Sequence, residues 1–268
     1  MARDDATRRF SNRVENYRRY RPGYPEAVGV LLEQRCELTP SAVVADVGSG
    51  TGLLSELFLR RGCTVYGIEP NQEMREAGER AMASWPRFSS VDGRAEATTL
   101  PGTSVDLVAA GQAFHWFDRR ASRAEFARIL KPGGWVVLVW NKRRKTGAPF
   151  LEAYERLLQR WSVDYADVDH ERVTDAVVEE FFAPAPYQRA VFPSEQRLEF
   201  EAARGRLESA SYVPAPDHPN HGPMLAELRE IFAAHGTEGK VVYTYDTVVY
   251  FGRLEAGAEA GSSRIIAE

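Results

Sequence analysis

The stretch VVADVGSGTGLL at residues 43–54 constrains the fold of this 268-residue chain more than any other feature. Its β-branched run is typical of a buried strand over 43–47, which brings the chain to Asp46. Three alternate glycines then turn the chain into a helix expected over 53–61: Gly48, Gly50 and Gly52. Glycine permits a positive φ and a close approach of backbone to ligand, and the following helix start offers unpaired N–H groups and partial positive charge. The pattern therefore predicts a ligand site at the end of this strand.

The spacing of the glycines separates two classes of cofactor. A nicotinamide or flavin site uses G-x-G-x-x-G to seat a pyrophosphate on the helix, but the last glycine of that pattern falls on Leu53. The observed G-x-G-x-G after an acid favours a cofactor whose tail is an amino acid. S-adenosylmethionine (SAM) fits, because its carboxylate suits the loop amides and its ammonium group suits Asp46. An NAD(P)-dependent oxidoreductase remains the less favoured reading.

An acid also closes the next expected strand, at 64–69. Glu69 follows Gly48 by 21 residues, and a carboxylate at this edge can accept hydrogen bonds from both ribose hydroxyls, as in dinucleotide folds. The alternative is an ordinary glycine turn with a chance acid at a strand end. The units that follow favour the cofactor site.

Strands and helices alternate through the first half of the chain. The expected strands lie at 43–47, 64–69, 88–92, 105–111 and 135–141, with helices between them. This rhythm implies βαβ units and a mostly parallel sheet covered on both faces. Beyond 141 the pattern changes to amphipathic helices around 150–161, 175–183 and 224–234, followed by a long strand at 241–254.

Composition excludes several classes of protein. The 34 Lys and Arg against 38 Asp and Glu give a net charge of −4, which argues against a general nucleic-acid binder. No apolar run approaches the about 20 residues of a membrane helix, and the start of the chain is unlike a secretory signal. Cys36 and Cys63 offer neither a disulfide framework nor a zinc site. We therefore expect a cytoplasmic monomer or homodimer that binds no metal, membrane or nucleic acid.

The motifs DVGSGTG, YGIEP, GRAEATTLPGTSVDLV, FHWF and RILKPGGWVVLVW resemble those of the class I SAM-dependent methyltransferases. The resemblance spans roughly residues 10–145. Within the superfamily the chain is similar to the small-molecule branch of trans-aconitate-type O-methyltransferases and ubiquinone/menaquinone-type C-methyltransferases. This implies a Rossmann-like α/β fold whose seven-stranded sheet is mostly parallel, with helices on both faces, an antiparallel last strand and an added helical lid. Strands near 191–200 and 241–254 would be the sixth and seventh.

We expect the chain to divide into four parts. These are an N-terminal lid segment at 1–35, a SAM-binding core at 36–145, helical cap elements with the last two strands at 146–255, and a disordered tail at 256–268.

The family's cofactor contacts can be transferred position by position. Asp46 and the three glycines would hold the methionine part, and Glu69 the ribose. Gln112, after the fourth strand, would approach the methionine end of the cofactor.

The implied adenine contacts are less specific. Pro70 would lie near the ring, while Ala95 and Glu96 would recognise its edge. Many relatives have an aspartate at the position of Arg94, which weakens this transfer. A solvated loop charge is the alternative for Glu96.

His115, just past the fourth strand, is the best-placed titratable group for a general base. An acceptor that is already a carboxylate needs no base, so the alternative that His115 only orients a loop or the cofactor carries more weight. Its neighbours Phe114 and Trp116 would either wall the acceptor pocket or belong to the core.

Two further segments bear on the acceptor. In the family an N-terminal segment folds over the cofactor, and here it would contribute Tyr17, Tyr20, Arg21 and Tyr24. Ser209, Ser211 and Tyr212 of the late loop would line the acceptor pocket, unless they form an ordinary hydroxyl-rich turn.

Two basic features suggest an anionic acceptor. Residues 1–25 hold seven arginines, and the run Lys142–Lys145 follows the fifth expected strand. The alternative, slightly favoured, is a solvated basic surface.

The leading hypothesis is a SAM-dependent methyltransferase that transfers a methyl group to a small-molecule acceptor at oxygen, with a carboxylate as one option, and releases S-adenosylhomocysteine (SAH). The alternative is a SAM-binding regulatory or partner protein that does not methylate.

Overall fold

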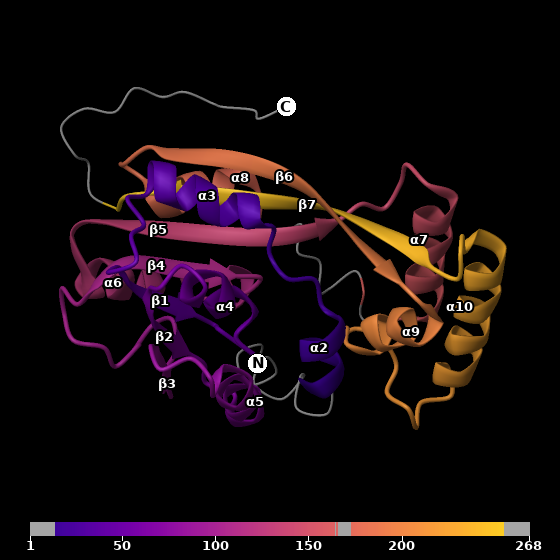
Figure 1. The fold of residues 1–268 in the computed structure, drawn as a ribbon. Helices are drawn as coiled ribbons and strands as arrows, with labels where there is room; N and C mark the ends of the chain where they lie inside the picture. Colours follow the sequence, from indigo (N-terminus) through magenta and orange to yellow (C-terminus); the bar gives the residue numbers. More distant parts are fainter. Residues whose placement is uncertain (1–13, 164, 166–172, 255–268) are drawn as a thin grey trace.

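A seven-stranded sheet organises the chain in the computed structural model, which describes residues 14–163, 165 and 173–254. The strands are β1 (Val43–Val47), β2 (Thr64–Ile68), β3 (Phe88–Val91), β4 (Val105–Gly111), β5 (Leu130–Arg143), β6 (Tyr187–Leu198) and β7 (Val241–Gly252). Their order is β3-β2-β1-β4-β5-β7-β6, and only β7 runs against its neighbours (Figure 1). The expected fold class is confirmed. The expected tail at 256–268 and the first part of the expected lid lie outside the described residues.

Helices connect the strands and cover the sheet. They are α2 (Val14–Tyr20), α3 (Glu26–Arg35), α4 (Leu53–Leu59), α5 (Gln72–Met82), α6 (Arg119–Ile129), α7 (Pro149–Trp161), α8 (Asp175–Phe182), α9 (Phe200–Glu208) and α10 (His221–His235), with the short 3₁₀ helix η1 (Phe114–Trp116).

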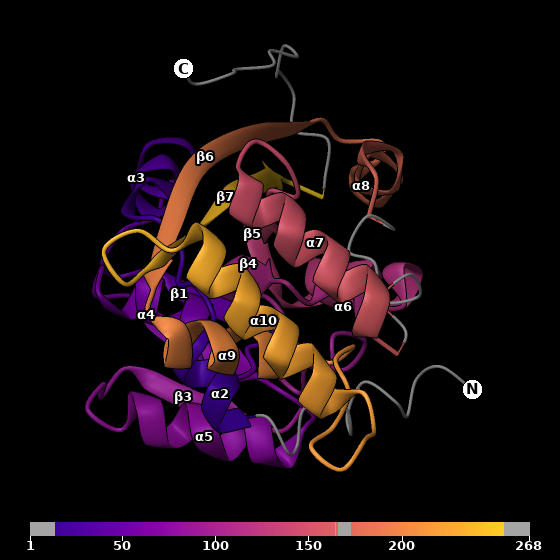
Figure 2. The same ribbon diagram turned by 90° about the vertical axis from the view of Figure 1, so that its right-hand side faces the viewer.

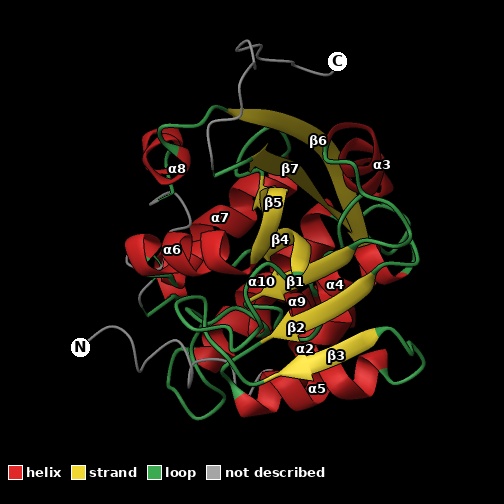
Figure 3. Ribbon diagram, turned by 90° about the vertical axis from the view of Figure 1, so that its left-hand side faces the viewer, coloured by secondary structure: helices red, strands yellow, loops and turns green. Residues whose placement is uncertain are grey.

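The central strands are apolar along their whole length because both faces of the sheet are buried. Side chains alternate between faces, so Val44 of β1 packs with α3 and α4, while Ala45 and Val47 pack with α6 and α8. Figure 3 shows these two pairs of helices on opposite sides of the strands. Asp46 is the one acid in this strand, and it is fully buried.

The order of the strands places the ligand-binding edge of the sheet. The chain runs from β1 outward through β2 and β3, then returns to pair β4 with the other side of β1. Such a reversal opens a crevice at the carboxyl ends of the two central strands. The glycine loop after β1 and the segment after β4 therefore face one another.

A third hydrophobic cluster, the cap, lies at the far ends of β6 and β7. Its helices α7 and α10 lie side by side across that end of the molecule, and α9 lies beside α10 (Figure 2). Leu157 of α7, Leu207 of α9 and Tyr243 of β7 are fully buried there.

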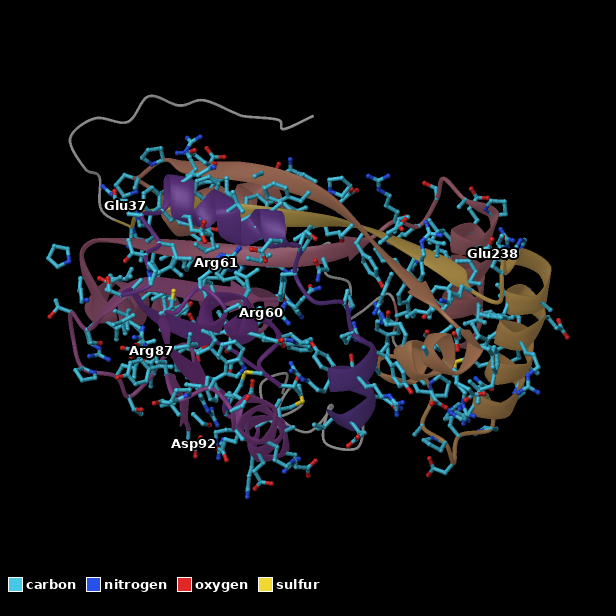
Figure 4. All side chains as sticks on the ribbon, in the orientation of Figure 1. Glu37, Arg60, Arg61, Arg87, Asp92 and Glu238 are labelled. Atoms are coloured by element: carbon cyan, nitrogen blue, oxygen red, sulfur yellow. The ribbon has the colours of Figure 1, made fainter. Side chains whose placement is uncertain are left out.

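The N-terminal segment is not a single lid. Helix α3 buries Val28 and Leu32 against the face of the sheet that α4 also covers, whereas α2 packs against α9 of the cap. Gly29 lets α3 lie directly on Arg61, since a Cβ at Gly29 would come within 1.8 Å of the Arg61 guanidinium carbon. Figure 4 shows Arg61 beside α3, where it pairs with Glu33. Only the part before α3 can therefore serve as the lid expected at 1–35.

Two strands and one helix depart most from what was expected from the sequence. Strand β5 is longer than 135–141 because its pairing with β7 continues to Arg143 opposite Tyr245. Strand β6 begins and ends earlier than 191–200, and α9 forms a helix where none was expected. Charged residues in these segments interrupt the apolar pattern, so the sequence does not reveal the strand pairing and burial that form in the folded cap.

The contact between α2 and α9 gives a test of the lid. A Cβ at Gly205 would lie 2.1 Å from the Tyr20 ring, so Gly205→Ala should displace α2 and lower the free energy of unfolding by about 1–3 kcal/mol. Gly222→Ala in α10 is the control, because its Cβ would meet nothing within 4 Å. Thermal and denaturant unfolding measure both variants. Equal stability of the two would contradict the packing described.

Candidate functional site

A cavity lies at the carboxyl ends of β1 and β4, closed by α2 and the cap. Five parts of the chain line it: the end of β1 and the glycine loop with the start of α4, segment 111–116 at the end of β4, the stretch 17–24 around the end of α2, Asn141 of β5, and segment 206–212 of the cap. In Figure 1, α2 stands between the sheet and α9. The cavity thus joins the expected cofactor loop to elements distant in sequence.

The glycine loop has the backbone geometry that only glycine adopts readily. Gly48, Gly50 and Gly52 have φ values of 70°, 55° and 83°. A Cβ at Gly48 would lie 2.5 Å from the Cβ of Ala113. The loop leads into α4, whose first N–H groups have no partner within the helix and belong to residues at the cavity. This is a cradle for a carboxylate.

Asp46 places a buried acceptor on the cavity. Its Oδ2 accepts a hydrogen bond of 2.6 Å from the Ser55 hydroxyl, while Oδ1 is buried without a hydrogen-bond partner in the described chain. Burial raises the pKa of Asp46 to about 7, opposed by the Ser55 hydrogen bonds and helped by the charge of Glu69. An ammonium group would satisfy this carboxylate.

Gln112 provides a second such acceptor from β4. It is a non-glycine residue at φ 58°, held by a backbone hydrogen bond to Val139 and by its own side-chain N–H, which donates to the Asn141 carbonyl at 3.2 Å. Its Oε1 is buried without a hydrogen-bond partner among the described residues. Together with Asp46 it fits the ammonium group of an amino-acid tail, which has three N–H donors.

Glu69 is committed to the loop itself. Its Oε2 accepts the Gly50 N–H and its Oε1 accepts the Asn71 N–H, both at 2.9 Å. Burial raises the pKa of Glu69, and these two hydrogen bonds oppose the rise. A carboxylate has about four acceptor positions, so two remain for ribose hydroxyls. Glu69 does not itself line the cavity and lies behind the loop that it holds.

The residues expected at the adenine are not brought to this cavity. Ala95 is buried in the core, and Glu96 accepts the Asp118 N–H at 2.7 Å, at the start of α6. Glu96 is therefore not the solvated loop charge that was the alternative expected from the sequence. It does not line the cavity. Pro70 does not line the cavity either.

The aromatic residues after β4 divide between core and site. Phe114 is buried and packs edge-to-face on Phe181, with ring centroids 4.7 Å apart. His115 and Trp116 line the cavity, and their rings lie 4.8 Å apart. The 3₁₀ turn of η1 directs the Phe114 ring into the core and the His115 and Trp116 rings toward the cavity.

The lid and late-loop residues also divide. Tyr17, Tyr24, Ser211 and Tyr212 line the cavity. Tyr20 does not, because its ring packs on Gly205 of α9. The Tyr24 hydroxyl lies over Gly111, where a Cβ would be 2.4 Å from its oxygen, and burial raises the pKa of Tyr24 well above its usual range.

The basic run at 142–145 does not face the cavity. Arg143 forms a buried ion pair with Glu155, and Arg144 pairs with Asp246. These arginines are already compensated, which corrects the expectation that the run attracts an anionic acceptor.

Asn141 and Arg206 are among the cavity residues that sequence reasoning missed. Asn141 ties lid to sheet, since its side-chain N–H donates to the Gly23 carbonyl at 3.1 Å and its Oδ1 accepts the Thr247 hydroxyl at 2.7 Å. Arg206 reaches the cavity from α9. An asparagine inside an apolar strand was a usable signal, whereas nothing in the sequence singles out Arg206.

Two features are absent from the residues that the structure describes. No group of His, Cys, Asp and Glu in the described part of the chain is arranged to hold a metal ion. Among the same residues, no helix combines the length and apolar character needed to cross a bilayer.

The raised pKa of Asp46 predicts pH-dependent cofactor binding. Below about pH 7 the free protein holds Asp46 protonated, so SAH affinity should fall by up to about tenfold for each further pH unit. Calorimetry from about pH 8 to about pH 5.5 measures this. Asp46→Asn should bind weakly and lack this dependence. A wild-type affinity that is constant over the range would contradict the assignment.

Because Glu69 accepts two backbone hydrogen bonds that hold the loop, its replacement should reduce both SAH binding and stability. Glu69→Gln turns an N–H toward a backbone N–H, so it should weaken SAH binding by roughly 1–3 kcal/mol and also lower thermal stability. The control is Glu37→Gln, which removes a charge from an exposed residue paired with Arg253 at the other end of the sheet (Figure 4). Unchanged binding and stability in Glu69→Gln would refute both roles.

Comparison with known proteins identifies the family. Residues 45–138 match the model of a methyltransferase domain. An uncharacterised methyltransferase of Mycobacterium tuberculosis is 39% identical over 145 residues, 53% of this chain and 56% of that protein. The chain thus spans little more than half the length of that relative.

Two further matches cover a larger share of the matched protein. An uncharacterised methyltransferase of Geobacillus kaustophilus is 31% identical over 156 residues, 57% of this chain and 69% of that protein. The solved structure described as a type II methyltransferase from Anaeromyxobacter dehalogenans superposes with a TM-score of 0.63 at 25% identity, covering 89% of this chain and all of that one. With the glycine loop and sheet order above, these matches show that the chain belongs to the class I SAM-dependent methyltransferases.

Proposed function

We propose that this protein transfers the methyl group of SAM to an oxygen atom of a small-molecule acceptor. The observation that carries the proposal is the pair of buried acceptor oxygens, on Asp46 and Gln112, in the same cavity as the imidazole of His115. The first two suit the ammonium group of the cofactor. The remaining wall, from the lid and cap, is left for an acceptor.

The cofactor supplies a methyl group already activated on a positively charged sulfur, so the protein's main task is alignment. The acceptor oxygen forms a bond to the methyl carbon as the carbon–sulfur bond breaks and its electron pair goes to sulfur. A well-oriented pair of reactants gains several kcal/mol relative to free encounter. The glycine loop and the Asp46–Ser55 pair would fix one reactant, and the lid and cap the other.

The enclosure supports a small acceptor. Tyr17 and Tyr24 from the N-terminal side line the same cavity as Ser211 and Tyr212 from the cap. Hydroxyl and aromatic groups of this kind surround a compact ligand with a few polar contacts, as in small-molecule sites generally. The resemblance to the trans-aconitate-type branch supports oxygen as the methylated atom.

His115 would act as a positioning residue or as a general base, according to the acceptor. A carboxylate oxygen carries its lone pair at neutral pH and needs no base, whereas a phenol must lose a proton. The imidazole is in reach of either role because it lines the cavity beside Trp116.

A methyl-transfer screen tests the proposal. Purified protein with methyl-labelled SAM is offered carboxylic acids, phenols and amines, and products are read by mass spectrometry for one added methyl group. Transfer to oxygen is expected. SAH binding without transfer to any compound would favour the non-methylating SAM-binding alternative.

His115→Ala then separates the two roles of the histidine. If His115 is a base, turnover should fall by roughly 10²–10⁴-fold with SAH affinity unchanged, and the loss should be greatest at high pH, where an unprotonated imidazole can accept a proton. If it only positions groups, the pH profile keeps its shape and the loss is small. Trp116→Phe is the matched control, since it changes the same wall without a titratable group.

A further inference from the structure

We propose that Arg21 and Arg206 form a binding site for a carboxylate of the acceptor, which makes an organic acid the substrate class. The inference rests on the proposed function and adds the residues that would select the acceptor. It comes from two guanidinium groups that line the cavity and that have no compensating acid among residues 14–163, 165 and 173–254.

Arg206 is the more deeply buried of the two. It projects from α9, only 6% of its surface is exposed, and its Nε donates a 3.4 Å hydrogen bond to the Tyr245 hydroxyl. Tyr245 in turn donates to Gln196 at 3.2 Å. Among the residues that the structure describes, no carboxylate lies within ion-pair distance of Arg206, and its two terminal nitrogens make no recorded hydrogen bond.

Arg21 holds its guanidinium in the same region from the lid side. Its Nε and Nη2 donate to the hydroxyl and carbonyl oxygens of Ser209 at 3.0 and 3.1 Å, and its charge lies 5.0 Å from the Tyr17 ring centroid. Burial, together with the positive charge of Arg206, lowers the pKa of Arg21. The two cations are therefore close enough to repel each other, and the described chain places no acid beside Arg21.

Such an arrangement is costly without a ligand. A buried charge is normally paired, because loss of hydration is not otherwise recovered. The same protein follows this rule at Arg143, which pairs with the equally buried Glu155. The residues that the structure describes place no acid beside Arg21 or Arg206, so a bound anion is a natural partner for these two charges. Two planar guanidinium forks match the two oxygens of a carboxylate.

The position of the pair assigns this carboxylate to the acceptor. The cofactor's own carboxylate already has a cradle in the glycine loop and the start of α4. Arg206 comes instead from the cap, beside Ser211 and Tyr212, and Arg21 is tied to the cap through Ser209. The cap is the part of the cavity left for the acceptor.

Arg206→Gln and Arg206→Met in the full chain test the assignment. The probes are small mono-, di- and tricarboxylic acids, with the amides of the same skeletons as neutral partners, offered with labelled SAM. We expect transfer to an acid but not to its amide, a loss of roughly 100-fold in kcat/KM carried mainly by KM in the variants, and SAH affinity within about twofold of wild type. Arg144→Gln, which removes an exposed arginine charge, is the control and should resemble wild type.

Stability gives a readout independent of turnover. Because Arg206 is buried with no acid beside it in the described part of the chain, Arg206→Met should melt at or above the wild-type temperature. Replacement of a structural arginine would instead lower the melting temperature. The acid that serves as substrate should raise the melting temperature of the wild-type SAH complex but not that of Arg206→Gln.

Three results would overturn the inference. Equal transfer to an acid and its amide would leave the methyltransferase proposal standing and remove the carboxylate site. Loss of SAH affinity in the Arg206 variants, with acceptor KM unchanged, would assign the guanidinium to the cofactor. A lower melting temperature of Arg206→Met, with unchanged kinetics, would make the residue structural. Failure of the proposed function is distinct, since SAH would bind while no acid or neutral compound is methylated.

Discussion

The hydrogen bonds that Glu69 accepts from Gly50 and Asn71 hold the rest of the site in place. The loop after β1 has three glycines at positive φ, and glycine gives a backbone high conformational freedom unless other contacts restrain it. Glu69 at the end of β2, and the Ile68 carbonyl that accepts from Gly48 and Ser49, fix it to the neighbouring strand. Because that loop is fixed, Asp46 and the start of α4 present their polar groups to one cavity.

The second half of the site is built by crosslinks between remote segments. Asn141 at the end of β5 holds the Gly23 carbonyl, and Arg21 holds Ser209, 188 positions further along the chain. Gly205 lets the Tyr20 ring approach α9 closely. These contacts bring the lid and cap over the sheet edge, so the acceptor wall depends on tertiary packing throughout. Arg206 is buried within that wall and has no ion-pair partner among the described residues, an arrangement that costs stability and is common where a site is prepared for a ligand.

Several features were predictable because their causes are local. The apolar run at β1, the Asn71 and Asp118 side chains that cap α5 and α6, and the glycine spacing all act within a few residues. The fold class, the cofactor class and the loop residues followed from them. Phe114 and Trp116 could not be separated in this way, since the 3₁₀ turn alone decides which ring enters the core. Glu96 likewise gained its partner, the Asp118 N–H, only when α6 folded beside it.

The sequence by itself determined the parallel core and the loop that suits an amino-acid tail, because periodicity, glycine conformation and strand-end acids are properties of short segments. Tertiary structure decided which charged side chains form ion pairs with each other and which line the cavity. It paired Arg143 and Arg144 of the conspicuous basic run with Glu155 and Asp246, and left Arg21 and Arg206 in the cavity. The physical reason is that an ion pair depends on the distance between groups from separate elements. No pattern along the chain records that distance.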